Sequence, residues 1–81
     1  MSTQHDAAET LDVQGVHCPM PIIETKQAIE TLAPGEVLEV LATDPGSVSD
    51  MAGWAEAADG VELVDQVEEA DRYRHYVRRE A

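Results

Sequence analysis

The chain has 81 residues with 17 acidic and five basic side chains, one cysteine and a formal net charge of −12 at pH 7. This size allows one small domain with a modest core and little room for an enclosed substrate cavity. The acidic balance argues against direct binding to nucleic acid, because a phosphate backbone repels a negative surface. A lone cysteine excludes an intramolecular disulfide framework and suits a reducing compartment.

The first ten residues, MSTQHDAAET, have neither a basic n-region nor an apolar h-region, and no apolar run is long enough to cross a bilayer. We therefore expect a cytoplasmic protein with no membrane contact. Residues 1–9 are predicted to be a flexible N-terminal segment and residues 10–81 a single domain. The acidic composition would stay soluble in high salt, although a solvated acidic face explains it equally well.

The first half of the chain predicts a strand, a helix and a second strand. Residues 10–14 alternate polar and apolar before Gly15, which predicts a short strand with Leu11 and Val13 facing inward. A helix is predicted from about residue 18 until the Ala-Pro-Gly sequence at 33–35; its apolar positions are Ile22, Ile29, Leu32 and Ala33. Residues 36–42 are aliphatic on both faces, which predicts a strand in the middle of the sheet.

The second half predicts a helix followed by a hairpin. Two signals could start the helix: Asp44 as N-cap with Pro45 after it, or Ser47 as N-cap with Asp50 closing a capping box. Its apolar stripe is Val48, Met51, Ala52 and Ala55, and the helix stops at Asp59-Gly60. Residues 61–67 and 73–77 are predicted strands joined by a charged turn at 68–71.

The predicted order is therefore β-α-β-α-β-β. Because a strand-helix-strand crossover is right-handed, the first two strands should be parallel. The fold class is α/β, a two-layer sandwich in which two helices cover one face of a four-stranded mixed sheet.

The cysteine lies where the first strand meets the first helix, in the sequence GVHCPMP at residues 15–21. With Cys18 as N-cap, Pro19 and Pro21 occupy first-turn positions where a missing N–H costs nothing, and they stiffen the helix start. Met20 is then the one free amide donor for a thiolate. That donor and the positive helix end would lower the pKa of the thiol. Cys18 is the candidate nucleophile, against the alternative of an inert buried cysteine.

These residues resemble the TusA (SirA-like) family of small sulfur-carrier proteins. The resemblance depends on Leu-Asp-x-x-Gly-x-x-Cys-Pro-x-Pro at residues 11–21, Pro-Gly-Glu at 34–36, Asp-Pro at 44–45 and a tyrosine-containing last strand that ends in Arg-Arg. It extends from about Thr10 to Arg79. The CPxP sequence is fairly specific when it follows Leu-Asp-x-x-Gly at this spacing.

The resemblance implies that Cys18 accepts sulfane sulfur as a persulfide and passes it to an acceptor protein. A cysteine desulfurase or a rhodanese-like protein would be the donor, and tRNA 2-thiolation, molybdenum-cofactor assembly or general sulfur trafficking would consume the sulfur. The protein would then be a sulfurtransferase-type carrier without cofactor or metal. The sequence departs from the family in Met20, where a charged or polar residue is usual, and in Ala55, where some relatives have a second cysteine.

Other interpretations of the same residues stay open. His17 could add positive charge near the thiolate, or be an exposed loop histidine. Arg72, Arg74 and Arg78 line one face of the last strand with Tyr76 between them. They could dock an acidic partner or RNA, or could pair with Glu62 and Glu68 across the hairpin. A regulatory protein-binding module with a structural Cys18, and a thiol sensor that forms intermolecular disulfides, are the alternative functions.

Overall fold

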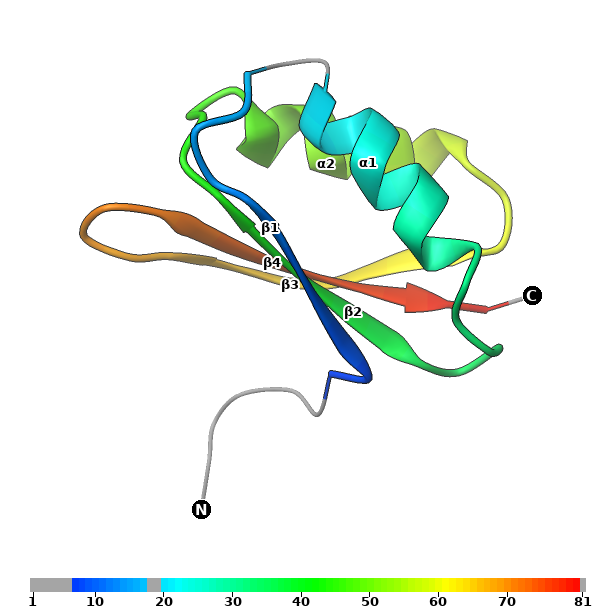
Figure 1. Cartoon of the computed structure of the whole chain (residues 1–81). Helices are drawn as coiled ribbons and strands as arrows, with labels where there is room; N and C mark the ends of the chain where they lie inside the picture. Colours follow the sequence, from blue (N-terminus) through cyan, green and yellow to red (C-terminus); the bar gives the residue numbers. More distant parts are fainter. Residues whose placement is uncertain (1–6, 18–19, 81) are drawn as a thin grey trace.

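The computed structural model describes residues 7–17 and 20–80 (Figure 1). Within them the elements are β1 (Glu9–Val13), α1 (Met20–Ile29), β2 (Val37–Ala42), α2 (Ser47–Ala57), β3 (Val61–Glu68) and β4 (Tyr73–Arg79). The predicted element order is confirmed. The expectations for residues 1–6, Cys18 and Pro19 lie outside the described residues, and β1 begins at Glu9, one residue earlier than predicted.

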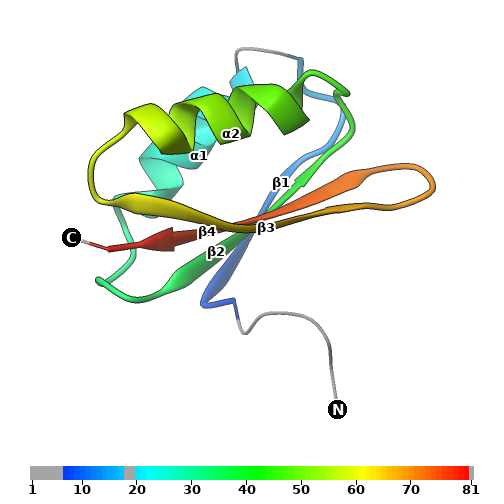
Figure 2. The ribbon, with the colours of Figure 1, turned by 180° about the vertical axis from the view of Figure 1, so that it is seen from behind.

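The four strands form one sheet in the order β1-β2-β4-β3. β1 runs parallel to β2, whereas β4 is antiparallel to both β2 and β3. Both helices lie on the same face of this sheet and leave the other face without a helix (Figures 1 and 2). The predicted two-layer α/β class is confirmed, and β2 lies inside the sheet as its two apolar faces indicated.

The core lies between the sheet and the two helices. Every second residue of β2 is buried against them: Leu38, Val40 and Ala42. Val13 from β1, Met51 from α2 and Val77 from β4 complete the centre of the cluster. Full burial of one such aliphatic side chain contributes about 1.5–3 kcal/mol, so this one layer of contacts is the main source of stability.

The first helix is shorter than its apolar pattern suggested. It ends at Ile29 because the amides of Thr31 and Leu32 donate to carbonyls three residues back, which tightens the last turn. This turn leaves Leu32 buried, but it leaves Ala33 exposed, so the prediction of Ala33 as an apolar helix position was wrong.

A residue from the far end of the chain completes this helix end. One guanidinium nitrogen of Arg79 donates to the carbonyls of Glu30 (2.8 Å) and Leu32 (2.6 Å). A cation among the last carbonyls of a helix satisfies orphan acceptors and matches the negative end of the helix dipole.

The start of α2 follows neither of the two predicted signals. Its N-cap is Gly46, without a side-chain cap, and the regular helix begins at Ser47. The Asp44 carboxylate accepts the N–H of Gly46 (3.0 Å) in the turn before the helix. The capping box on Ser47 was wrong. Its hydroxyl faces inward and lies 3.0 Å from Nε2 of the buried His75, so it cannot cap the helix.

The hairpin of β3 and β4 carries one irregularity. The register shifts between Leu63 and Asp65, so Val64 is an extra residue in β3. Such a bulge increases the local twist of a strand, and β3 is an edge strand, where bulges discourage pairing with other chains.

Candidate functional site

The two loops that lead into the helices lie together at one end of the molecule. Both helices begin at this end, where the parallel strands β1 and β2 finish (Figure 1). Gly15 has φ +81°, a conformation that glycine adopts at little cost, and its N–H donates to Oγ1 of Thr43 at 2.8 Å. The loop before Cys18 is therefore tied to the loop before α2. No sequence pattern pointed to Thr43.

The start of α1 differs in one respect from the prediction. The N–H of Met20 donates to the carbonyl of His17 (3.0 Å), so this amide is not the free donor that was expected for the thiolate. The bond satisfies one of the orphan donors of the first turn with the backbone of the loop itself. Of the predicted site residues, Met20 and His17 are exposed, Pro21 is buried, and Cys18 and Pro19 lie outside the described residues.

The buried Pro21 anchors the start of α1. Its ring is buried, and its carbonyl accepts the hydroxyl of the buried Thr25 (2.7 Å). The first turn of α1 contains no acidic residue, even though the chain is strongly acidic. A helix start without a carboxylate keeps its positive end available to another anion, such as a thiolate.

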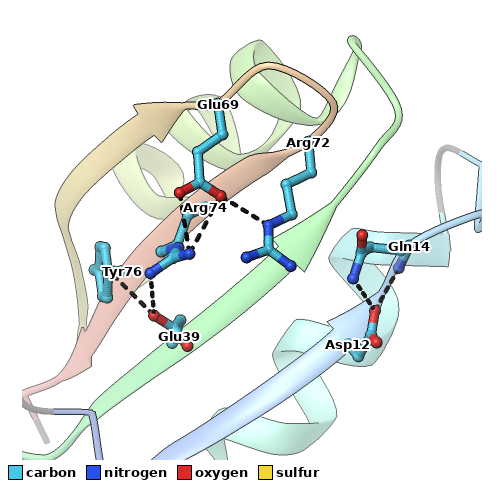
Figure 3. A network of polar contacts seen from close by, with 7 residues as sticks. All are labelled: Asp12, Gln14, Glu39, Glu69, Arg72, Arg74 and Tyr76. Carbon is cyan, nitrogen blue, oxygen red and sulfur yellow. Dashed lines mark hydrogen bonds and ion pairs between the residues drawn. The ribbon is translucent and has the colours of Figure 1, made fainter. Parts of the chain in front are cut away.

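Asp12 is the acidic residue at the end of β1. Its carboxylate accepts both the backbone N–H of Gln14 (3.0 Å) and the side-chain amide of the same residue (3.1 Å) (Figure 3). These two bonds, the backbone one first, hold the pKa of Asp12 below its usual value. Asp12 therefore shapes the turn into the Cys18 loop as a carboxylate anion.

A second polar cluster, Ser47, Gln66 and His75, lies beneath the start of α2, with Ser47 and His75 buried and Gln66 half-buried. The Gln66 side-chain nitrogen donates to the carbonyl of Val48 (2.9 Å) and lies 3.1 Å from Nδ1 of His75. Because that nitrogen is a donor, Nδ1 is the acceptor, and the proton of the neutral imidazole is on Nε2, facing Ser47. Burial lowers the pKa of His75, which agrees with a neutral ring.

The cluster has the composition of a serine-histidine pair, but it is not built for nucleophilic catalysis. An imidazole that donates to the hydroxyl cannot also take its proton. Both side chains are also buried, His75 at 0% and Ser47 at 1% exposure, so no substrate reaches them. The cluster joins α2 to the hairpin and is structural.

Arg72, just before β4, and Arg74 and Arg78 of β4 lie on the face of the sheet without helices, and acids pair with them. Arg72 and Arg74 both bond to Glu69, at 2.7 and 3.0 Å, and Arg74 also reaches Glu39 at 3.5 Å (Figure 3). Tyr76 donates to the same Glu39 carboxylate at 2.8 Å. The hydrogen bond from Arg72 and the charges of both arginines hold the pKa of Glu69 below its usual value.

One of the two acidic partners predicted for these arginines is confirmed. Arg78 does pair with Glu62, as expected. The prediction that Glu68 pairs with an arginine was wrong. Glu68 faces Tyr73 across the ladder on the helix side of the sheet, and Glu69 in the turn pairs with Arg72 instead. Arg72, Arg74 and Arg78 therefore each form an ion pair with an acidic side chain.

Two surface hollows are lined by residues outside the first turn of α1. One of about 180 Å³ lies between the far ends of the two helices, where Lys26 and Arg79 are balanced by Glu30 and Asp59. Trp54 lines it and packs against the core. Residues 7–17 and 20–80 contain no group of three potential ligands that could hold a metal ion, and no helix among them could span a membrane.

The comparisons with known proteins agree over nearly the whole chain. A model of the family Sulfurtransferase TusA matches residues 9–79. A putative sulfur carrier protein of Halobacterium salinarum is 62% identical over 79 residues, 98% of either chain. The sulfur carrier protein TusA of Allochromatium vinosum is 36% identical and covers 91% of this chain and 96% of its own.

A solved structure shows the same fold. The SirA-like protein from Desulfitobacterium hafniense superposes with a TM-score of 0.70 at 26% identity, over 88% of this chain and 95% of its own.

Proposed function

This chain belongs to the TusA family of sulfur carriers, and on that premise we propose that Cys18 carries the sulfur as a persulfide and relays it to an acceptor protein. The observation that carries the proposal is the start of α1. There a loop with the CPxP sequence leads into a helix whose first turn holds no acid and whose outer side chains are exposed. Such a site leaves the positive helix end to the thiolate.

The proposed reaction is an exchange between two sulfur centres. The Cys18 thiolate attacks the outer sulfur of a donor persulfide, a new S–S bond forms to Cys18, and the donor S–S bond breaks. The donor cysteine leaves as a thiolate and takes the electron pair of the broken bond. The acceptor repeats the step on Cys18, so neither oxidant nor reductant is consumed in the transfer.

The supporting residues have revised roles in this proposal. Pro19 and Pro21 stiffen the helix start, and the buried Pro21 anchors it. Met20 supports the same turn through its bond to the His17 carbonyl, and the helix end as a whole stabilises the thiolate. No metal or cofactor enters the proposed reaction.

The proposed partners are proteins on both sides of the transfer. A cysteine desulfurase or rhodanese-like protein would supply the sulfur in the cytoplasm, and the acceptor would serve tRNA 2-thiolation, molybdenum-cofactor assembly or general sulfur trafficking. Arg72, Arg74 and Arg78 are paired with acids and do not form an open basic surface, which supports a protein rather than a nucleic acid as the direct acceptor.

The mass of the intact protein tests this proposal. The reduced chain is incubated with a cysteine desulfurase and L-cysteine, or with rhodanese and thiosulfate, and the Cys18→Ser variant is treated identically. We expect a gain of one sulfur, about 32 Da, that a reducing agent removes and that the variant lacks. No gain from either donor would overturn the proposal and favour a regulatory binding module with a structural Cys18.

A further inference from the structure

A hollow of about 220 Å³ lies between the start of α2 and the hairpin of β3 and β4. The tip of this hairpin extends past the start of α2 (Figures 1 and 2). One lining residue comes from α2, and the others come from the end of β3 and the start of β4: Val48, Gln66, Val67, Glu68, Tyr73 and His75. Sites for drug-sized ligands usually measure about 300–1,000 Å³, so this hollow suits a smaller molecule.

The polar side chains of this hollow have unused hydrogen-bond acceptors. The side-chain nitrogen of Gln66 donates to the carbonyl of Val48 (2.9 Å), which fixes the orientation of the amide and leaves its oxygen as the other end. Among the described residues, this oxygen and the Glu68 carboxylate have no hydrogen bond or ion pair, and the same is true of the Tyr73 hydroxyl. A ligand of this hollow must therefore supply donors.

The charge of the hollow is also uncompensated. Glu68 lies on the helix side of the sheet, whereas Arg72 and Arg74 lie on the other face and bond to Glu69. The ring of His75 is buried and its two nitrogens face other side chains, and this burial lowers its pKa, so the ring adds no positive charge. No described residue that lines the hollow is therefore a cation that could neutralise the carboxylate.

We propose that this hollow binds a small organic cation, a guanidinium group on a short aliphatic chain. The planar fork of N–H donors matches the acceptors of Glu68 and Gln66, and the ring of Tyr73 attracts a cation to its face. The aliphatic chain packs on Val48 and on Val67, which is 40% exposed. A metal ion suits the hollow less, because the described part of the chain contains no group of three potential metal ligands. The site is independent of the proposed sulfur transfer, since none of its residues belongs to α1 or to the loop before it.

A titration with n-butylguanidinium chloride tests this site. Backbone amide shifts of the isotope-labelled full chain follow the binding, and N-butylurea, an uncharged molecule of nearly the same shape, is the control ligand. Two variants lose the same charge: Glu68→Gln in the hollow, and Glu56→Gln at an exposed position of α2 outside it. The same spectra report whether each variant keeps the fold.

We expect saturable shifts at residues 66–68 and 73–75, with a Kd of about 1 mM for so small a ligand. Glu68→Gln should weaken binding by about fivefold or more and Glu56→Gln by less than about twofold, because only the first removes a direct ionic contact. N-butylurea should give no saturable shift. Equal weakening in the two variants would mean that the acidic surface attracts cations in general, and the site would be refuted. Saturable binding of N-butylurea, or shifts that centre on other residues, would refute it as well.

Discussion

The two helices of this protein start at the same end of the molecule, but different side chains and bonds surround the two starts. Each begins where one of the two parallel strands ends, and each has a proline near its first turn. The start of α2 is filled by the chain itself: Asp44 accepts an amide and Ser47 meets His75. The start of α1 has no acid, and its outer apolar side chains face solvent. One start is closed by internal bonds, and the other presents exposed apolar side chains without an internal carboxylate.

This comparison teaches that helix geometry alone does not create a reactive site. Both helix starts present the positive end of a helix dipole. What differs is whether an internal carboxylate already occupies that end. The following variants test this difference, in order of decreasing expected effect.

Ser47→Ala should cost the most stability. It leaves the Nε2–H of the buried His75 without its acceptor, and an unsatisfied buried donor costs about 1–3 kcal/mol. Urea denaturation measures the loss, and Ser49→Ala, an exposed serine of the same helix, is the control, with a change within about 0.5 kcal/mol. Equal losses in the two variants would show that the buried cluster does not hold α2.

Gly15→Ala should lower the stability slightly less than Ser47→Ala, but it should also change the reactivity of the Cys18 thiol. A residue with Cβ at φ +81° is strained by about 1–2 kcal/mol, and relief of the strain would shift the loop that Thr43 holds. We expect a lower melting temperature and at least a twofold change in the rate of Cys18 alkylation.

Gly35 offers the control for this variant. It has φ +91°, and an added Cβ would meet no atom within 4 Å, so Gly35→Ala should cost similar stability. Because Gly35 lies just before β2, away from the helix starts, its substitution should leave alkylation unchanged. If both alanine variants changed alkylation equally, the link between Gly15 and the Cys18 loop would be wrong.

Asp44→Ala should cost about 1 kcal/mol, because it removes the acceptor of the Gly46 N–H in the turn before α2. Asp44→Asn keeps an oxygen acceptor for the Gly46 amide and should recover most of the loss. Chemical denaturation of the two variants at neutral pH measures the difference. A loss as large for asparagine as for alanine would mean that charge, rather than the hydrogen bond, holds the turn.

The smallest expected effect is a change in the free energy of unfolding with pH. Burial lowers the pKa of His75 in the folded chain, so the unfolded chain binds more protons just below the unfolded value of about 6.5. Stability is then complete above that value and declines as pH falls toward the folded-state pKa. The ring contacts the uncharged Ser47 and Gln66, and Glu68 and Tyr73 line the neighbouring hollow.

Denaturation between pH 5 and 8 checks this slope against two histidine substitutions. His75→Gln should flatten the part of the curve that His75 causes, after allowance for a lower overall stability. His17→Gln removes an exposed loop histidine and should leave the slope in place. A curve of His75→Gln that is parallel to that of the unsubstituted chain would contradict the assignment.

The fold was predictable because each element carries its own signal. The alternation of residues 10–14, the double apolar pattern of 36–42 and the turn at 68–71 are local, and the crossover rule then fixes the parallel pair. The family, too, was predictable from the spacing of the CPxP sequence, and the comparison with TusA confirms it.

The errors concern contacts, near and far along the chain, that the sequence pattern does not reveal. Ser47 looks like a cap until His75, 28 residues away, competes for its hydroxyl. Glu68 and Glu69 are equivalent in sequence, and only the turn geometry selects Glu69 for Arg72 and Arg74. The amide of Met20 seemed free because nothing in the sequence shows the carbonyl of His17 turning toward it. The persulfide role of Cys18 stays a prediction.

The position of β4 between β2 and β3 has a consequence for synthesis of the protein on the ribosome. The strand that emerges last belongs in the interior of the sheet, so β1, α1, β2 and α2 can form only an unfinished sheet while translation continues. At about 5–20 residues per second, the open side of β2 stays exposed for seconds before β4 arrives. During that interval the nascent chain has an unprotected strand edge, which its many negative charges help to keep from pairing with other nascent chains.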